Sequence, residues 1–132
     1  MKNLNILPLA LIFCMLILGC DKDDEIIQTS FLNMKWIESY EEKTSEEIEI
    51  YRPGDHEDFP ASWYRQVFIF DDNGELEYSV LAANDAHYMA KGNWEYNEKT
   101  KILKIYNSDL EKIYDFEIIE LTNQVLKIKA NN

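Results

Sequence analysis

Short runs of alternating apolar and polar residues follow one another along most of the chain. After Phe31 no stretch keeps the 3.6-residue period of an amphipathic helix, whereas Ile, Val, Phe, Tyr and Trp recur in runs separated by turn residues. This pattern predicts an all-β fold with eight strands. The predicted strands are Leu32–Tyr40, Glu46–Arg52, Trp63–Phe70, Glu75–Leu81, Tyr88–Tyr96, Lys101–Tyr106, Lys112–Leu121 and Val125–Lys129.

The connections between these strands are mostly short, and the clearest turn signal is Asn73-Gly74. Asn-Gly between two apolar runs is typical of a hairpin, because both residues tolerate a positive φ. Eight strands joined in this way predict an antiparallel up-and-down barrel, because closure removes the open edges of the sheet. Such a barrel has an interior that its own side chains can fill, or that can hold one small ligand.

The first residues of the chain have a different pattern. A short polar segment with one lysine precedes a mostly apolar run, residues 4–18. The run is shorter than a membrane-spanning helix needs. This arrangement is typical of a secretory signal peptide. The run ends in Leu16-Ile17-Leu18-Gly19-Cys20, which resembles the bacterial lipobox. The resemblance implies cleavage before Cys20 and acylation of its thiol, which would anchor the protein in a membrane. The alternatives are an uncleaved anchor, or an ordinary signal peptide with a chance cysteine.

An acidic run follows the cysteine. Asp21-Lys22-Asp23-Asp24-Glu25 resembles the export signal of Bacteroidetes lipoproteins, which implies a location on the outer face of the outer membrane. Asp21 directly after the cysteine would mean inner-membrane retention by enterobacterial rules, and a plain solvated tether is a further alternative. The predicted organisation is a signal peptide at 1–19, an acidic tether at 20–30 and one barrel domain at 31–132.

The net charge of −12 limits the choice of partners. Strong negative charge opposes binding to nucleic acid and to anionic membrane surfaces, and favours solubility and a basic partner or cations, although a plain solvated acidic surface is the alternative. The chain has two cysteines, of which Cys14 would be removed with the signal peptide and Cys20 would be acylated, so no disulfide is expected. We expect a monomer.

Several short motifs, in their order along the chain, resemble the small lipocalin-like domains of Bacteroidetes lipoproteins. They are Asn33-Met34-Lys35-Trp36, Phe68-Ile69-Phe70-Asp71-Asp72-Asn73-Gly74, Gly92-Asn93-Trp94-Glu95-Tyr96, and the ending 114–122 followed by Leu126-Lys127-Ile128. The resemblance covers roughly Phe31 to Ala130, with Met34 in place of the glycine that usually begins the first motif. It implies a barrel and supplies no catalytic residues.

Seven aromatic residues can face the interior of this barrel. They could line a cavity for a small apolar ligand, since such sites are mostly apolar, or they could fill the interior themselves. The candidate ligand-lining residues are Trp36, Phe68, Phe70, Trp94, Tyr96, Tyr114 and Phe116.

A second candidate site lies in the connection between the second and third predicted strands. Acidic residues there precede two aromatic residues, a combination suited to a basic protein partner, although a solvated loop with a cap on the barrel would look the same. The candidate interaction patch is Asp55, His56, Glu57, Asp58, Trp63 and Tyr64.

Catalytic and metal chemistry have weak support in the sequence. The carboxylates of residues 54–58 and 71–75 could hold a cation, but neither segment has the spacing of a known metal site. The two histidines, His56 and His87, fall in predicted loops, and no G-x-S-x-G nucleophile motif is present. We therefore expect no enzymatic activity, no metal and no cofactor.

Two hypotheses of function remain. The first is a lipid-anchored, non-enzymatic envelope lipoprotein that binds a small apolar ligand inside a lipocalin-like barrel. The second is a protein-interaction or accessory lipoprotein, with a filled barrel, that uses its acidic outer loops to bind a basic envelope protein.

Overall fold

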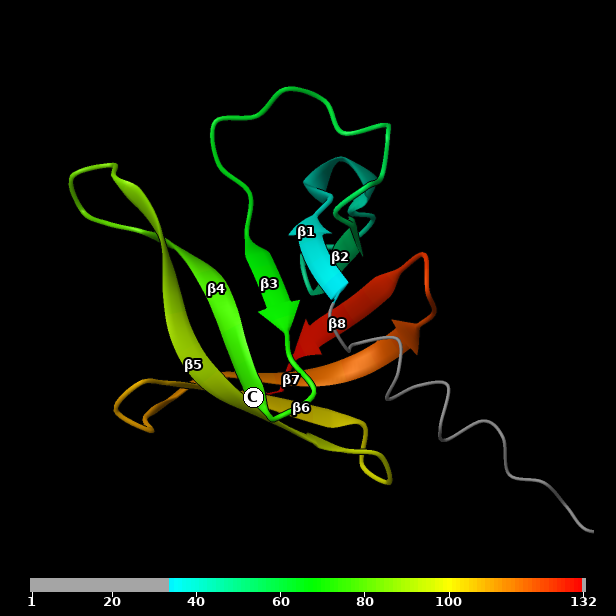
Figure 1. Ribbon diagram of the computed structural model, residues 1–132. Coiled ribbons are helices and arrows are strands. Elements are labelled where there is room, and N and C mark those ends of the chain that lie inside the picture. The colour runs from blue at the N-terminus through cyan, green and yellow to red at the C-terminus, as the bar shows by residue number, and fades with distance from the viewer. Residues whose placement is uncertain (1–33, 132) are drawn as a thin grey trace, which may run out of the picture.

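The computed structural model describes residues 34–131, which form a closed barrel of eight antiparallel strands (Figure 1). The strands are β1 (Met34–Glu38), β2 (Ile48–Pro53), β3 (Val67–Phe70), β4 (Glu75–Leu81), β5 (His87–Asn97), β6 (Ile102–Asn107), β7 (Lys112–Leu121) and β8 (Leu126–Ala130), and one short 3-10 turn, η1 (Tyr40–Glu42), follows β1. The predicted all-β class and eight-stranded antiparallel up-and-down barrel are confirmed. The predicted signal peptide, Cys20, the tether and residues 31–33 lie outside the described residues.

The order of the strands around the barrel differs from a simple meander in one place. From β3 to β8 each strand pairs with the next strand in the chain. However, β1 lies between β2 and β3, and β2 closes the barrel on β8. Since β2 and β3 are both antiparallel to β1, they run in the same direction. The connection between them, loop 54–66, must therefore carry the chain from one end of the barrel to the other.

The two ends of the barrel differ in what they carry. One end, here called the distal end, holds the β4–β5 turn (82–86) and the β6–β7 turn (108–111), on the left in Figure 1. The other, here called the proximal end, holds the β3–β4, β5–β6 and β7–β8 turns. Met34, where β1 begins, pairs with Phe70 at the finish of β3 and therefore lies at the proximal end.

The interior of the barrel is packed with large side chains. Alternate residues of each strand point inward, as the period of two requires, and eight of them are almost completely buried. Each such side chain contributes about 1.5–3 kcal/mol relative to full exposure. The eight are Trp36, Tyr51, Phe68, Phe70, Leu103, Ile105, Leu126 and Ile128.

Two glycines in this fold have identifiable roles. Gly74 closes the predicted β3–β4 hairpin with a φ of 84°, and it is the one residue of that turn with a positive φ. Gly92 lies against the backbone of β6, where a Cβ would be 2.1 Å from the carbonyl oxygen of Tyr106.

Most strand boundaries are within two residues of the prediction, and two differences at the distal end affect the candidate site. The third strand begins at Val67 instead of Trp63, because the amide of Val67 donates to Oγ of Ser79 (2.7 Å) and residues 64–66 leave the ladder. The fifth strand begins at His87, which the sequence placed in a loop. Both differences concern the distal end, where β4 and β5 extend beyond β3.

Candidate functional site

The seven predicted ligand-lining aromatics are brought together, but as packed core. Trp36, Phe68, Phe70 and Phe116 are buried members of the core, and Trp94, Tyr96 and Tyr114 pack against it. The rings meet directly: the Phe68 and Tyr114 centroids are 5.7 Å apart, those of Tyr114 and Phe116 5.3 Å, and those of Phe70 and Trp94 5.4 Å. These side chains therefore occupy the space that a ligand would need.

Two grooves open on the surface of the barrel. A groove of about 930 Å³ includes Tyr96 together with charged side chains such as Glu95 and Lys104. A second groove of about 560 Å³ includes Phe70 beside Glu77 and Lys91. Each groove thus takes in one of the predicted lining residues, and each is rimmed by charge.

Polar groups occupy the interior near the distal end. The hydroxyl of Tyr51 donates to Oε2 of Glu49 (2.8 Å), and the backbone amide of Gln66 donates to Oε2 of Glu38 (3.2 Å). Burial raises the pKa of Tyr51 well above its usual value, so its hydroxyl stays protonated as a donor. The barrel interior is therefore apolar at its centre and polar at this mouth.

One buried donor in the core lacks a partner. Nε1 of Trp36 is inaccessible to solvent and donates to no acceptor within residues 34–131. A buried N–H without an acceptor costs about 1–3 kcal/mol. The interior therefore contains one hydrogen-bond donor available to an acceptor.

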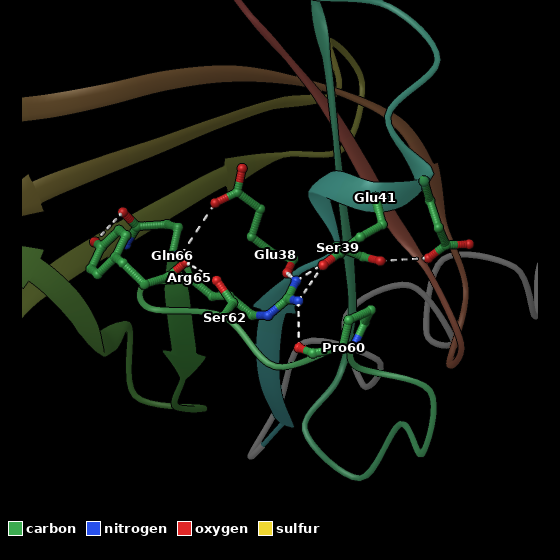
Figure 2. A network of polar contacts seen from close by, with 9 residues as sticks. Glu38, Ser39, Glu41, Pro60, Ser62, Arg65 and Gln66 are labelled. Atoms are coloured by element: carbon green, nitrogen blue, oxygen red, sulfur yellow. Dashed lines mark hydrogen bonds and ion pairs between the residues drawn. The ribbon is translucent and has the colours of Figure 1, made fainter.

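Loop 54–66 is held in place by Arg65, whose side chain is only 10% exposed. Its guanidinium donates to the carbonyl oxygens of Glu38 (2.8 Å) and Pro60 (2.9 Å) and to both carboxylate oxygens of Glu41 (Figure 2). It also lies over the rings of Tyr40 and Phe59, at 4.5 and 5.0 Å. One side chain thus joins the loop to β1 and η1, and it lowers the pKa of Glu41.

The predicted interaction patch divides into two parts on this loop. Asp55, Glu57 and Asp58 are exposed, and the ring of His56 packs edge-on against Phe59 (5.1 Å). Trp63 and Tyr64 instead contact the first residue of β5. Within the described part of the chain, no group of three or more His, Cys, Asp or Glu side chains is arranged to hold a metal ion.

Trp63 and Tyr64 both pack against His87, which the sequence analysis considered only as a histidine in a predicted loop. The ring of His87 lies 4.9 Å from Trp63 and 5.2 Å from Tyr64, edge-on to both. Trp63 nevertheless remains 65% exposed. The loop is therefore attached to the β4–β5 hairpin through this histidine.

Most of the exposed large apolar side chains lie at the distal end. We call five of them the distal apolar surface, since they belong to loop 54–66 and to the two distal hairpins. They are Trp63, Leu81, Tyr88, Met89 and Leu110. Sequence reasoning found only Trp63, because the other four occur in strand and turn patterns that give no sign of exposure.

Leu110 is unusual in two ways. It is 71% exposed and its backbone has a φ of 63°, the left-handed region that bulky side chains rarely adopt. Glycine or asparagine would suit this turn position better, and a polar side chain would suit the exposure. Such a departure from local preference is a common property of functional positions.

Comparisons with known proteins gave no match. No protein-family model, no curated protein and no solved structure matches this chain. Residues 34–131 contain no helix that is long and apolar enough to cross a membrane.

Proposed function

We propose that this protein is a lipid-anchored, non-enzymatic envelope protein that binds a protein partner through its distal apolar surface. The observation that carries this proposal is the contrast between interior and exterior. The centre of the barrel is filled by its own aromatic side chains, while Trp63, Tyr88 and Leu110 are left in solvent at one end. Exposed large apolar side chains mark interaction sites in soluble domains, and here most of them lie at one end of the barrel, on both faces of the β4–β5 hairpin, on loop 54–66 and on the β6–β7 turn.

The position of Met34 determines how an anchored barrel would be oriented. Met34 lies at the proximal end, so a tether that precedes it joins the barrel opposite the distal apolar surface. Lipidation at Cys20, which the lipobox-like Leu16–Cys20 suggests, would then direct this surface away from the membrane. The run Lys22-Asp23-Asp24 supports export to the cell surface in the outer membrane.

The charge around the distal end favours a basic partner. Asp85 on the β4–β5 turn and Asp109 and Glu111 on the β6–β7 turn are exposed, and none of these three carboxylates forms an ion pair within the described residues. Unpaired surface charges of one sign steer a partner of the opposite sign and make association depend on salt.

Site-specific photocrosslinking in intact cells tests this proposal. A photoreactive side chain is placed at Met89 in the distal apolar surface, and at Ile119, an exposed apolar residue of β7 outside it, as the matched control. The proposal predicts one protein adduct of defined mass from position 89 and not from 119. The same adducts from both positions, or none from position 89, would contradict it.

A second candidate is a lipocalin-like carrier that binds a small apolar ligand inside the barrel. The unpaired Nε1–H of Trp36 favours it, because a ligand with one acceptor atom could satisfy this donor. Side chains that now meet in the core, such as Phe68 and Tyr114, would have to move apart. The candidate predicts that Trp36→Phe weakens retention of a copurifying small molecule, and the absence of any such molecule would remove it.

A further inference from the structure

The β4–β5 hairpin extends beyond its neighbours on both sides. Its ladder continues to the pair Leu81↔His87, whereas β3 pairs with β4 only as far as Phe68↔Tyr78. On the other side β6 pairs with β5 only as far as Gly92. We call this two-stranded extension, residues 79–91, the arm. Its tip diverges from the β6–β7 turn (Figure 1).

The hydrogen-bond alternation shows which backbone groups of the arm face outward. The amide of Ala82 donates to the carbonyl of Ala86, and the amide of Trp94 donates to that of Gly74. In an antiparallel ladder alternate residues bond to the same neighbour, so the even-numbered residues of β5 bond to β4. His87 and Met89 therefore direct their amides and carbonyls away from β4, and within the described residues these groups have no partner.

The opposite edge of the arm is covered at Ser79. The carbonyl of Ser79 accepts hydrogen bonds from Nε2 of Gln66 (3.0 Å) and from the hydroxyl of Tyr64 (3.3 Å). Loop 54–66 thus covers the β4 edge near Ser79. The β5 edge has no such cover, although an exposed row of unpaired backbone groups readily pairs with another chain.

We infer that the β5 edge at His87–Met89 is the place where the partner adds an extended segment as a further strand. This inference rests on the proposed function and names its mode of recognition. Main-chain hydrogen bonds would supply affinity, and alternate side chains of the segment would contact Met89 on one face and Tyr88 on the other.

Acidic side chains outnumber basic ones around this edge, which indicates the chemistry of the segment. Asp85 lies at the arm's tip, and Asp109 and Glu111 lie on the β6–β7 turn beside the exposed Leu110, whereas Lys91 at the base of the arm is the one lysine of residues 79–91. A segment that alternates lysine or arginine with apolar residues would match these acids and the apolar side chains together. A second copy of this chain fits less well, because each copy carries a net charge of −12 and the copies repel.

The test uses the full mature chain in detergent and a synthetic peptide that alternates Lys with Val and Tyr. Binding is measured by titration, and backbone amide exchange by NMR. The expected result is slower exchange at His87 and Met89 in the complex. A peptide with Glu in place of Lys should bind at least about tenfold more weakly, and added salt should weaken the Lys peptide.

Two substitutions at one position separate the backbone from the side chain. Met89→Pro removes the amide that faces away from β4. The hydrogen bonds of Tyr88 and Ala90 to β4 remain, because only the even-numbered residues of β5 bond to that strand. It should weaken peptide binding about tenfold or more, whereas Met89→Ala, which keeps the amide, should weaken it less than about threefold. Slow exchange at Tyr88 and Ala90 in the free Met89→Pro protein verifies that the arm remains folded.

Several results would overturn the inference. These are binding without protection of His87 and Met89, equal loss of affinity in the two variants, no binding of the Lys peptide, or dimerisation of the chain through this edge. If the photocrosslink at Met89 still formed, the partner surface would stand and only the strand-addition mode would fail.

Discussion

The ring of Trp63 lies edge-on against His87, with centroids 4.9 Å apart. This contact attaches loop 54–66 to the first residue of β5, and it holds an exposed tryptophan beside the open edge of the arm. Edge-on aromatic pairs contribute about 0.5–1.5 kcal/mol beyond their burial. Loop and arm therefore form one surface, although 24 positions separate the two residues in the sequence numbering.

Replacing His87 with Ala should release Trp63 from this position. We expect iodide quenching of Trp63 fluorescence to increase, while the free energy of unfolding falls by no more than about 1 kcal/mol. A Trp63→Phe protein gives the signal of Trp36 and Trp94, which must be subtracted. Unchanged quenching would show that the contact does not hold the indole.

Leu110→Gly should make the protein more stable and its binding weaker. Glycine adopts the φ of 63° without strain, so the free energy of unfolding should rise by about 1 kcal/mol. The same change removes an exposed apolar side chain from the distal apolar surface. The neighbouring Asp109→Gly, where φ is not positive, is the matched control and should not stabilise; a loss of stability in Leu110→Gly would contradict the argument.

Arg65→Lys should loosen loop 54–66 while leaving the barrel folded. Lysine keeps the charge but has three N–H donors on a single nitrogen, so it cannot reproduce the four hydrogen bonds that two guanidinium nitrogens make to Glu38, Pro60 and Glu41, and we expect a loss of about 1–2 kcal/mol. Amide exchange should become faster in the loop and remain slow in β6 and β7. Equal acceleration throughout the chain would show that Arg65 supports the whole barrel.

The pair Glu42–Arg52 should make stability depend on pH in a defined window. Hydrogen bonds from Arg52 lower the pKa of Glu42 to about 2, from its usual 4.5. A lowered folded-state pKa gives stability that is present above pH 4.5 and is lost as the pH falls toward 2.

The matched variant is Glu42→Gln. Because the Glu42 side chain is partly exposed, we expect a difference of only about 1 kcal/mol from the original protein at pH 7, after allowance for solvent screening. Urea titrations at several pH values should show this difference shrinking below pH 4.5. A difference that stays constant down to pH 2 would mean that the ion pair does not contribute.

Gly92→Ala should be among the most destabilising substitutions that add a single carbon. The new Cβ would lie 2.1 Å from the Tyr106 carbonyl oxygen, so β5 and β6 must separate, at a cost of about 2–4 kcal/mol. Gly54→Ala is the control, because its contact is with the flexible Lys35 side chain, and it should cost less than about 1 kcal/mol. Similar thermal unfolding midpoints for the two variants would contradict this reading.

Much of the barrel could be predicted from local sequence, because strand alternation is a local property. The inward positions of Trp94 and Phe116 follow from the period of two, and Gly74 marks its hairpin. The place of β1 between β2 and β3 could not be predicted, since pairing between distant strands depends on the packing of the whole barrel. The family resemblance stays a prediction.

In the candidate sites, too, local features could be predicted from the sequence, whereas features that depend on distant strands could not. The aromatic content of the core was evident, but whether Phe68 and Tyr114 touch depends on how far apart the barrel walls lie. Trp63 was identified from its acidic neighbours. Met89 and Leu110 were missed and His87 was placed in a loop, because the roles of these residues depend on where neighbouring strands end and on the backbone angle of one turn.

The most direct test of the account compares two masses of the full-length protein purified in mild detergent from its own envelope: the native mass and the mass after denaturation. The denatured mass reports the chain and its covalent lipid, and the difference reports what the folded protein holds. We predict that the difference is zero or the mass of a protein chain, because the barrel is filled and its partner binds outside. A reproducible difference of small-molecule size would contradict this, and would indicate a carrier with its ligand inside the barrel.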